Sequence, residues 1–559
     1  MNSFLHISRR ILCFLTIATF SLVATAQPKW VKKVRKAQLN LVTYDAKGQL
    51  LHSTNGFLVD ESGTVLSDYK SFQGAARAVA IDEKGTEYPV QTVCGASSLY
   101  DVIKLRVDLP KPSPLNIASV NSQKGEPLYV MPYLSNKSGV ATPTTVEELK
   151  NFDEIYAYYT LPVRLPEKTL SCPVMNEAGE VVGLVQMSAK SDEQKSYVIS
   201  AAYVRDLKTS ALSANANDYR EVLIRKELPE DVSQASSFIY LTGTRDTALY
   251  LAYVEDFIRR FPTESNGYTM QAEMLAAAGR LSEADAAWEA GCQACSNRHE
   301  LDYSRARTIL SAVQSGRPLP EAWSLEQAAS LIRQAEAADP QPIYIALEGH
   351  ISYAQKRYAE AAAKFQEVNR TSLRSAEHFL YAAQCYQMLG DTLSVLALQD
   401  SAVACYSRPY TTEAAPALLM RATTLNALGR YRDAVKDLND YEHLMSRSLN
   451  DNFYYLRYQI EMQCRLFPQA LSDIEQATRM APNEPLYFAE LAATHFRFDQ
   501  LDEAVAAARK AIALDANFAD AHRILGVCLR AQKKEREAQE ELQKAIDLGD
   551  EISKTLLNQ

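Results

Sequence analysis

The pattern of hydrophobic and polar positions changes character partway along the chain. Up to about residue 207, short apolar runs are separated by turns, and examples are residues 39–44, 56–60, 78–82, 102–107, 127–130 and 181–185. The turns carry glycines, as in Ala46-Lys47-Gly48 and Glu177-Ala178-Gly179. Many short strands separated by turn signals predict an all-β barrel or sandwich.

The second pattern is helical and continues to the end of the chain. Apolar residues recur at i, i+3 and i+4, and Ala, Leu, Glu, Lys and Arg dominate. The small polar residues 210–218 separate the two patterns and predict a linker. We therefore expect a multidomain protein with a β domain over residues 34–209 and an all-α region over residues 219–557.

The first 26 residues predict a secretory signal peptide. Arg9 and Arg10 precede the apolar stretch 11–23, and Ala24-Thr25-Ala26 fits a cleavage site. An uncleaved anchor is the alternative, for which the stretch is short, and no later run approaches the ~20 apolar residues of a spanning helix. Cys13 lies inside the apolar stretch, which argues against a lipoprotein. We expect export to the periplasm, with secretion or outer-membrane association as alternatives.

Charge limits the choice of partners. The net charge of -9 argues against a protein that tracks nucleic-acid phosphates. The acidic excess lies in the helical region, which favours a partner segment that carries Lys or Arg. The basic run Lys29 to Lys36 could touch anionic lipid, but a solvated arm is the preferred interpretation. Nothing in the sequence calls for a cofactor.

Eight cysteines follow the first 26 residues, too few for a disulfide framework, and their pairing stays open. Cys292 and Cys295 form a single CxxC after a helical run that we expect to end near Gly291. A redox motif belongs at a helix start beside a strand, so a local structural pair or two thiols is preferred. No second CxxC or histidine cluster lies nearby to suggest zinc.

The helical region repeats itself. One small position recurs at intervals of 33 to 44 residues, and four of the intervals are 34; Tyr250 and Val395 hold the same position. The alanines at this position are Ala284, Ala328, Ala361, Ala434, Ala470, Ala504 and Ala538. Glycines such as Gly429 precede the position, and Pro262, Pro340 and Pro482 end the following helix.

In period and residue type these units resemble the tetratricopeptide repeat (TPR). Small residues sit where two helices cross closely, and each hairpin covers its apolar face with the next one. The resemblance implies a TPR superhelix of about nine hairpins over residues 219–557. It also implies a groove that receives a protein or peptide partner. The oligomeric state stays open.

The β region resembles trypsin-like serine peptidases of the HtrA type. The matching blocks are residues 55–75, with Gly56-Phe57 and a Gly-Ala turn, residues 100–107, residues 170–183, with Pro173 and Gly183, and the closing strand and helix 196–207. The resemblance implies a double β-barrel.

Aligned on these blocks, the catalytic positions of the family have changed. The general base histidine falls on Lys70, the orienting aspartate on Asp101 and the nucleophilic serine on Leu170. The glycine after the nucleophile falls on Ser171 and the one two residues before it on Lys168. Peptide cleavage needs a nucleophile, a base and backbone donors for the oxyanion. The sequence therefore predicts a pseudoenzyme whose β domain binds without cutting, joined to a scaffold.

Two arrangements would restore an enzyme. A one-residue shift would make Ser171 a nucleophile with Lys70 as its base, or Cys172 could pair with His52. Both conflict with the register set by Pro173. The competing hypothesis is therefore a serine or cysteine peptidase with a non-standard site and repeats that recruit substrate. A structural subunit of an envelope assembly is a third possibility.

Overall fold

The computed structural model describes residues 28–133, 140–186, 194–243, 247–316 and 318–557. The predicted signal peptide, residues 1–26, lies outside the described residues. The chain divides into two compact units, residues 1–278 with 289–296 and residues 279–288 with 297–559. The division falls inside helix α8 (Leu281–Ala294).

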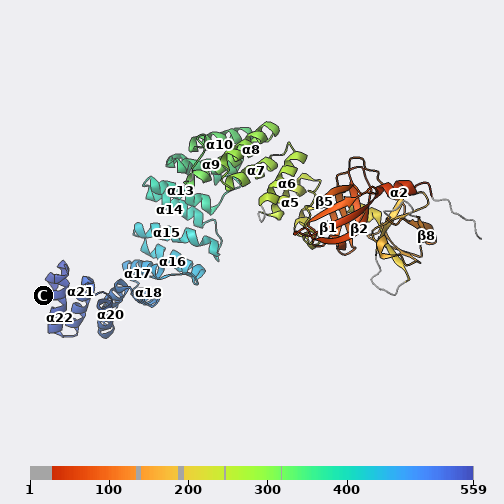
Figure 1. Ribbon diagram of the computed structural model, residues 1–559. Coiled ribbons are helices and arrows are strands. Elements are labelled where there is room, and N and C mark those ends of the chain that lie inside the picture. Colours follow the sequence, from red (N-terminus) through yellow and green to blue (C-terminus); the bar gives the residue numbers. More distant parts are fainter. Residues whose placement is uncertain (1–27, 134–139, 187–193, 244–246, 317, 558–559) are drawn as a thin grey trace, which may run out of the picture. The chain divides into compact units, whose positions relative to one another are not determined.

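The first unit begins with a closed six-stranded barrel (Figure 1, red to orange). Its strands follow one another in the order β1-β2-β3-β6-β5-β4, and all the neighbouring pairs are antiparallel. Inward residues such as Leu39, Leu41 and Phe57 are fully buried, as the period of two requires. The strands are β1 (Gln38–Tyr44), β2 (Leu50–Leu58), β3 (Thr64–Ser67), β4 (Arg77–Ile81), β5 (Glu87–Ser97) and β6 (Val102–Val107).

A seven-stranded antiparallel sheet follows in the order β8-β7-β11-β12-β13-β10-β9. Its two end strands do not pair among the described residues, so the second half of the predicted double barrel is an open sheet. Its strands are β7 (Pro127–Val130), β8 (Thr142–Thr145), β9 (Glu148–Phe152), β10 (Tyr156–Leu161), β11 (Pro173–Met175), β12 (Val181–Gln186) and β13 (Ser196–Ser200).

Glycine is required at two of the predicted turns. Gly63 has a φ of +83°, and a Cβ there would lie 1.9 Å from the carbonyl oxygen of Val107. Gly179 has a φ of +80°, and a Cβ there would lie 2.5 Å from the Trp30 ring. Both positions combine left-handed backbone with a close neighbour, which only glycine tolerates.

Short helices complete the β part, and three long ones follow it within the first unit. They are α2 (Val31–Ala37), η1 (Lys70–Phe72), η2 (Glu167–Thr169), α3 (Ala201–Asp206), η3 (Ala211–Ala214), α4 (Asn217–Arg220), α5 (Val232–Thr242), α6 (Thr247–Arg260) and α7 (Ser265–Ala277). The predicted linker 210–218 thus contains η3 and the first half of α4.

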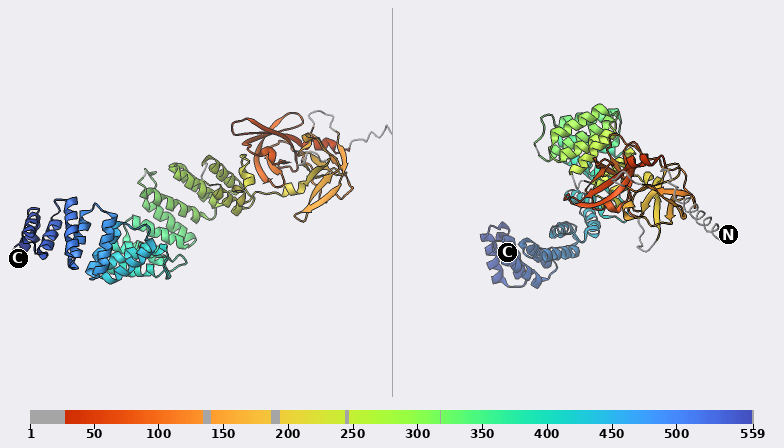
Figure 2. Two further views of the ribbon diagram at one scale, coloured as in Figure 1. Left: turned by 90° about the horizontal axis from the view of Figure 1, so that it is seen from below. Right: turned by 45° about the vertical axis from the view of Figure 1, so that its right-hand side comes forward.

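The second unit consists of helices joined by short turns, and its helices pack pairwise in chain order (Figures 1 and 2). After α8 they are α9 (Arg298–Gln314), α10 (Leu325–Ala338), α11 (Pro342–Ala354), α12 (Tyr358–Val368), α13 (Ala376–Met388), α14 (Thr392–Val403), η4 (Thr412–Ala414), α15 (Ala415–Ala427), α16 (Tyr431–Met445), α17 (Asp451–Gln463), α18 (Phe467–Met480), α19 (Pro485–Arg497), α20 (Leu501–Leu514), α21 (Ala519–Ala531), α22 (Glu535–Asp547) and α23 (Glu551–Leu557).

The recurring alanine occupies the same place in every helix that carries it. It is the fourth residue of α8, α10, α12, α16, α18, α20 and α22, and it is 0% exposed in all of them. A small side chain that is buried at the same place in each of these helices lets the neighbouring helix pack closely. The fold class predicted from the sequence, a β domain followed by an all-α region, is confirmed.

An ion pair also recurs at one place in the hairpins. It joins the seventh residue of the first helix to the seventh residue of the second. The pairs are Arg421 with Asp437 (2.7 Å) and Arg457 with Asp473 (2.6 Å), and Glu348 with Lys364 (2.6 Å) has the charges reversed. The same spacing of 16 residues in each pair shows that these hairpins are built alike.

Two details differ from the sequence analysis or add to it. Helix α8 continues past Gly291 to Ala294, so Cys292 lies inside the helix and Cys295 just after it. Glycine lowers helix propensity by only about 1 kcal/mol, which the packing of a hairpin overrides. None of the helices in the described ranges has both the length and the apolar character of a membrane span.

Candidate active-site cleft

Two of the three positions that correspond to the family's catalytic residues lie together. Lys70 opens η1, and Asp101 lies in the turn before β6 with a φ of 51°. The Lys70 Nζ is 3.3 Å from the Asp101 Oδ2, and the Lys70 backbone N–H donates to Oδ1 at 2.9 Å. The lysine side chain is 74% exposed. The residues at the positions of the general base and of the orienting aspartate are thus in contact, and they form an ion pair at the surface.

The third position, Leu170, has neither a nucleophile nor a backbone donor to offer. It follows the η2 turn, and its own N–H donates to the carbonyl of Glu167 at 3.0 Å. The next two amides are also engaged, because Ser171 donates to Val185 at 2.9 Å and Cys172 to Thr169 at 3.0 Å. An oxyanion hole needs N–H groups that point at the substrate. Three consecutive amides at this loop are committed to the protein itself.

The first barrel holds the carbonyl groups of the same loop. The Asn55 amide on β2 donates to the carbonyl oxygen of Lys168 at 3.0 Å and to that of Leu170 at 2.8 Å. These two bonds cross from one half of the β part to the other. They hold the loop at Leu170 itself and two residues before it.

Ser171, the alternative nucleophile, has a buried side chain that points away from Lys70's ion pair and toward Asp68. Its backbone is left-handed, with a φ of 59°, which suits a position that the family fills with glycine. Its side chain is fully buried, and the hydroxyl donates to Asp68 Oδ1 at 2.9 Å. Lys70, its proposed base, pairs with Asp101. The structure therefore does not bring Ser171 and Lys70 together as a catalytic pair.

Asp68 is a central residue that the sequence analysis did not single out. Its carboxylate is 2% exposed and lies just after β3. It accepts hydrogen bonds from Thr54 Oγ1 at 2.5 Å, from the Ser71 N–H at 3.0 Å and from Ser171. An aspartate after a strand usually signals an exposed turn, so the sequence held no sign of its burial.

The second arrangement, Cys172 with His52, is not formed either. Cys172 is fully buried, where its Sγ accepts the N–H of Tyr133 at 3.4 Å. Burial raises the pKa of its thiol to about 12, so almost none is thiolate at neutral pH. His52 lies exposed on β2, opposite Thr43 of β1.

The segment between the β part and the long helices, residues 207–231, contacts both loops of the Lys70–Asp101 pair. We call it the connecting segment. Glu221 accepts from the hydroxyl of Tyr69 at 2.9 Å and from the amide of Gln73 at 2.8 Å, on either side of Lys70. Asp218 accepts from Ser98 at 2.5 Å, close to Asp101. The loops that carry the pair are thus held from outside the barrel.

The connecting segment also extends the barrel. The N–H of Val93 on β5 donates to the carbonyl of Arg225, and the N–H of Glu227 donates to the carbonyl of Val93, both at 2.9 Å. Tyr219, Val222 and Ile224 are buried in the barrel core. The predicted linker, residues 210–218, is therefore followed directly by residues that pack into the barrel.

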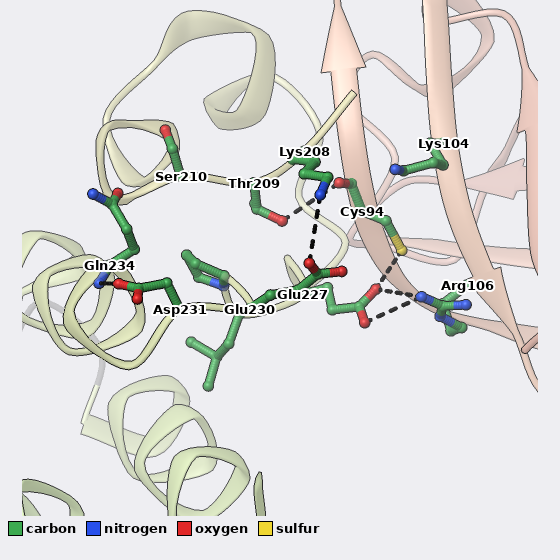
Figure 3. A pocket seen from close by; sticks show the side chains of 12 residues that line it. Cys94, Lys104, Arg106, Lys208, Thr209, Ser210, Glu227, Glu230, Asp231 and Gln234 are labelled. Atoms are coloured by element: carbon green, nitrogen blue, oxygen red, sulfur yellow. Dashed lines mark hydrogen bonds and ion pairs between the residues drawn. The ribbon is translucent and has the colours of Figure 1, made fainter. Parts of the chain in front are cut away.

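A small cavity of about 300 Å³ lies where this segment crosses the barrel (Figure 3). Within it, the Cys94 thiol donates to the Glu227 carboxylate, which also accepts from Arg106 at 3.1 Å. Burial, followed by the charge of Glu227, raises the pKa of Cys94 to about 12. This cysteine is thus a structural thiol. Among the described residues, no group of His, Cys, Asp and Glu is arranged to hold a metal ion.

Residues 54–184 match the family model of the trypsin-like peptidase domain. Among curated proteins, none matches the chain. The active form of a protease from M. tuberculosis is 18% identical, with a TM-score of 0.28, over 33% of this chain and 86% of that one. A serine endoprotease from Yersinia pestis is 14% identical, with a TM-score of 0.28, over 32% of this chain and 69% of that one.

The family match confirms the trypsin-like domain that the sequence predicts. It includes the three positions Lys70, Asp101 and Leu170, and it ends at Leu184 on β12. An HtrA-type protease solved with a tripeptide is 13% identical, with a TM-score of 0.28, over 32% of this chain and 60% of that one. The helical region lies outside the matched residues.

Proposed function

We propose that this protein is an exported scaffold in which an inactive trypsin-like domain and a TPR array each bind a protein segment. The β domain holds its client without cleaving it, and the array docks a second partner. The periplasm is the proposed compartment. The proposal rests first on Leu170, whose side chain offers no nucleophile and whose N–H is bonded to Glu167.

Three further observations in the cleft support the absence of catalysis. Ser171 is buried against Asp68, and Cys172 is buried with a strongly raised pKa. Lys70 is largely exposed and paired with Asp101. A lysine that serves as a general base lies beside its nucleophile, whereas the contact of Lys70 is with Asp101.

The TPR assignment is supported by the equivalence of the hairpins. The alanine at the fourth residue of the second helix recurs fully buried, and the ion pair between seventh residues recurs with the same spacing. Hairpins that stack in this way leave a surface formed by the first helices of successive units. The acidic charge of this region favours a partner segment with Lys or Arg.

Activity-based labelling tests the inactive cleft. Full-length protein is treated with a fluorophosphonate and, separately, with iodoacetamide, before and after unfolding. We expect no fluorophosphonate labelling of the folded protein, because the Ser171 side chain is fully buried. We also expect no alkylation of Cys172 until the protein unfolds, because the Cys172 side chain is fully buried as well. Labelling of the folded chain that disappears in Ser171→Ala or Cys172→Ala would instead establish the peptidase.

Cross-linking tests the scaffold. Full-length protein is cross-linked to partners in envelope fractions, and the linked peptides are identified by mass spectrometry. The proposal expects the links on the first helices of the hairpins, such as α13, α15, α17 and α19 (Figure 1). Links confined to the second helices, such as α16 and α18, would contradict binding in a groove.

A further inference from the structure

A second cavity in the first unit, of about 380 Å³, is lined by four arginines and two carboxylates. It lies where β5 and β6 meet the connecting segment and the last turn of α6. Neither the trypsin-like cleft nor the hairpins account for it. Four guanidinium groups in one cavity are unusual in a chain with a net charge of -9.

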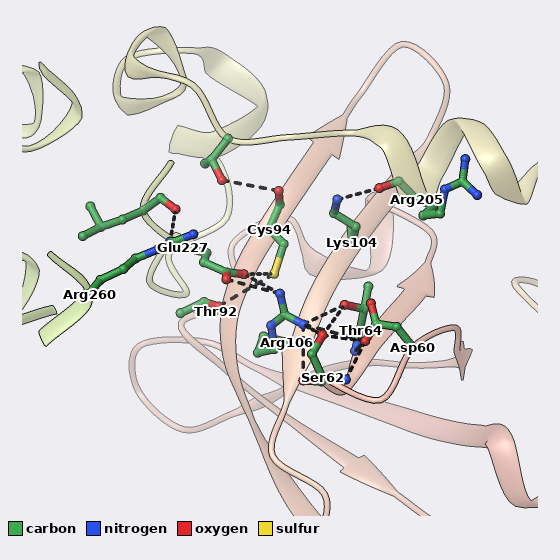
Figure 4. Close-up of polar contacts among 12 residues, drawn as sticks. Asp60, Ser62, Thr64, Thr92, Cys94, Lys104, Arg106, Arg205, Glu227 and Arg260 are labelled. Atoms are coloured by element: carbon green, nitrogen blue, oxygen red, sulfur yellow. Dashed lines mark hydrogen bonds and ion pairs between the residues drawn. The ribbon is translucent and has the colours of Figure 1, made fainter. Parts of the chain in front are cut away.

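One arginine of the cavity is neutralised by a direct partner. Arg106 Nη2 donates to both oxygens of Glu227, at 3.1 and 3.2 Å (Figure 4). Its Nη1 lies 3.9 Å from Asp60 and donates to Thr64 at 2.8 Å. The pair Arg106–Glu227 therefore joins the barrel to the connecting segment and leaves no charge for a ligand.

The other three arginines have only one carboxylate among them, and two of them contact it. Asp256 Oδ2 lies 2.9 Å from Arg225 Nη1, and its Oδ1 lies 2.8 Å from Arg259 Nη1. Arg260 Nη1 donates to the carbonyl of Leu228 at 2.8 Å (Figure 4). With three guanidinium groups and one carboxylate, this side of the cavity carries two positive charges that no lining carboxylate in the described part of the chain neutralises.

The contacts also leave donors unused. Arg259 and Arg260 each engage one Nη1, and their Nη2 groups donate to no atom within the described residues. Position at a helix C-terminus explains why two arginines suit the end of α6. It does not explain the presence of Arg225, which comes from the connecting segment, or the contact of the Arg260 side chain with the Leu228 carbonyl. Guanidinium groups with spare parallel N–H donors bind phosphate and carboxylate oxygens in pairs.

We propose that this cavity binds a phosphomonoester. A phosphomonoester carries between about 1.5 and 2 negative charges at neutral pH, which matches the two positive charges, whereas one carboxylate would neutralise only one. The cavity exceeds the size of a phosphate group, so it also accommodates part of the group that bears the phosphate. Arg259 and Arg260 bind the phosphate oxygens, and Arg225 contacts the other oxygen of Asp256.

Titration calorimetry on the full-length protein tests the site, with glycerol 3-phosphate as the soluble probe. We expect saturable binding that weakens as salt is added. The double variant Arg259→Gln/Arg260→Gln should lose about tenfold or more in affinity, because both phosphate forks are gone. The matched control is Arg164→Gln, at an exposed position in the loop after β10, and it should bind as the natural protein does.

Asp256→Asn is a second variant, and we expect its effect on the affinity to be in the opposite direction. Removing the one shared carboxylate raises the positive charge of the cavity, so affinity for the probe should increase about threefold or more. Unchanged affinity in both variants, or no binding of the probe and of phosphate-bearing vesicles, would overturn the proposal.

Vesicles of phosphatidylcholine with phosphatidic acid distinguish the source of the phosphate. Sedimentation with these vesicles, lost in Arg259→Gln/Arg260→Gln and without binding of the soluble probe, would assign the site to a lipid headgroup. Binding of an acidic peptide alone would contradict phosphate chemistry. These outcomes do not depend on the labelling or cross-linking that test the proposed function.

Discussion

Buried carboxylates of the β part and of the helices α16–α18 are stabilised in different ways. Asp68 accepts only from neutral donors, two hydroxyls and one amide. In the hairpin, Arg457 bonds Asp473 twice and Glu442 once, and Glu461 lies beside them. The hairpin therefore collects more carboxylates than its arginine neutralises, while the cleft holds a single one.

This difference predicts that substitutions in the two places have different effects. Hydroxyl and amide donors from separate segments hold the Asp68 carboxylate in one arrangement. An excess of buried carboxylates makes the hairpin depend on one arginine and on protonation. Substitutions can test each half of this comparison.

The largest effect is expected for Arg457→Ala. Its side chain is 7% exposed, and removing it leaves Asp473 and Glu442 without their cation. Breaking a buried ion pair in this way costs about 3–5 kcal/mol. Urea unfolding and hydrogen exchange in α16–α18 would measure the loss. The control Arg479→Ala, 60% exposed on α18, should change stability by less than about 0.5 kcal/mol. A similar loss in both variants would contradict the role assigned to Arg457.

Asp68→Ala should rank second. It leaves the hydroxyls of Thr54 and Ser171 and the N–H of Ser71 buried without an acceptor, at a cost of about 2–3 kcal/mol. The midpoint of denaturant unfolding, followed by near-UV circular dichroism, would report it. Asp108→Ala, at an exposed position, is the control. A stable Asp68→Ala protein would show that the polar cluster is dispensable to the cleft.

Glu461→Gln should alter the pH dependence of the hairpin. Burial, followed by the charge of Asp473, raises the pKa of Glu461 to about 8 from its ordinary value of 4.5, although Arg457 acts in the opposite direction. Between these values the folded chain binds more protons than the unfolded chain, so stability falls as pH rises through this window.

The variant removes that dependence. At pH 9 we expect Glu461→Gln to be more stable than the natural protein by about 1–2 kcal/mol, with little difference at pH 5. Thermal unfolding at the two pH values measures this, and Glu475→Gln, 41% exposed, is the control. An equal effect of Glu461→Gln at both pH values would exclude titration as its cause.

The smallest effect is expected for Lys70→Met. Exposed ion pairs contribute about 0–1 kcal/mol, and this lysine is 74% exposed. We expect a change below about 0.5 kcal/mol in the same urea titration. A large loss would mean that the Lys70–Asp101 pair supports the cleft in a way that its exposure does not suggest.

Local signals in the sequence predicted much of the fold. The turn glycines Gly63 and Gly179 have positive φ, and the recurring alanines are buried, because each position is dictated by neighbouring backbone. The register at the cleft is also consistent, since Ser171 adopts the left-handed backbone of a glycine position.

The features that the sequence did not reveal depend on contacts between distant residues. Tyr69 and Glu221 are 152 positions apart, and Asp68 and Ser171 are 103 apart. Nothing in the local pattern marks residues 219–227 as part of a barrel or Asp68 as buried. The arginine cavity likewise needs β6, the connecting segment and α6 to be brought together before it can be recognised.

The connecting segment has a consequence for the order in which the chain folds during synthesis. Tyr219, Val222 and Ile224 pack inside the barrel, yet they emerge from the ribosome after all thirteen strands have been made. The strands can pair earlier, but the core is complete only when these late residues arrive. We therefore expect a chain cut at residue 209 to lack part of the barrel core and to be digested by protease faster than the full-length protein.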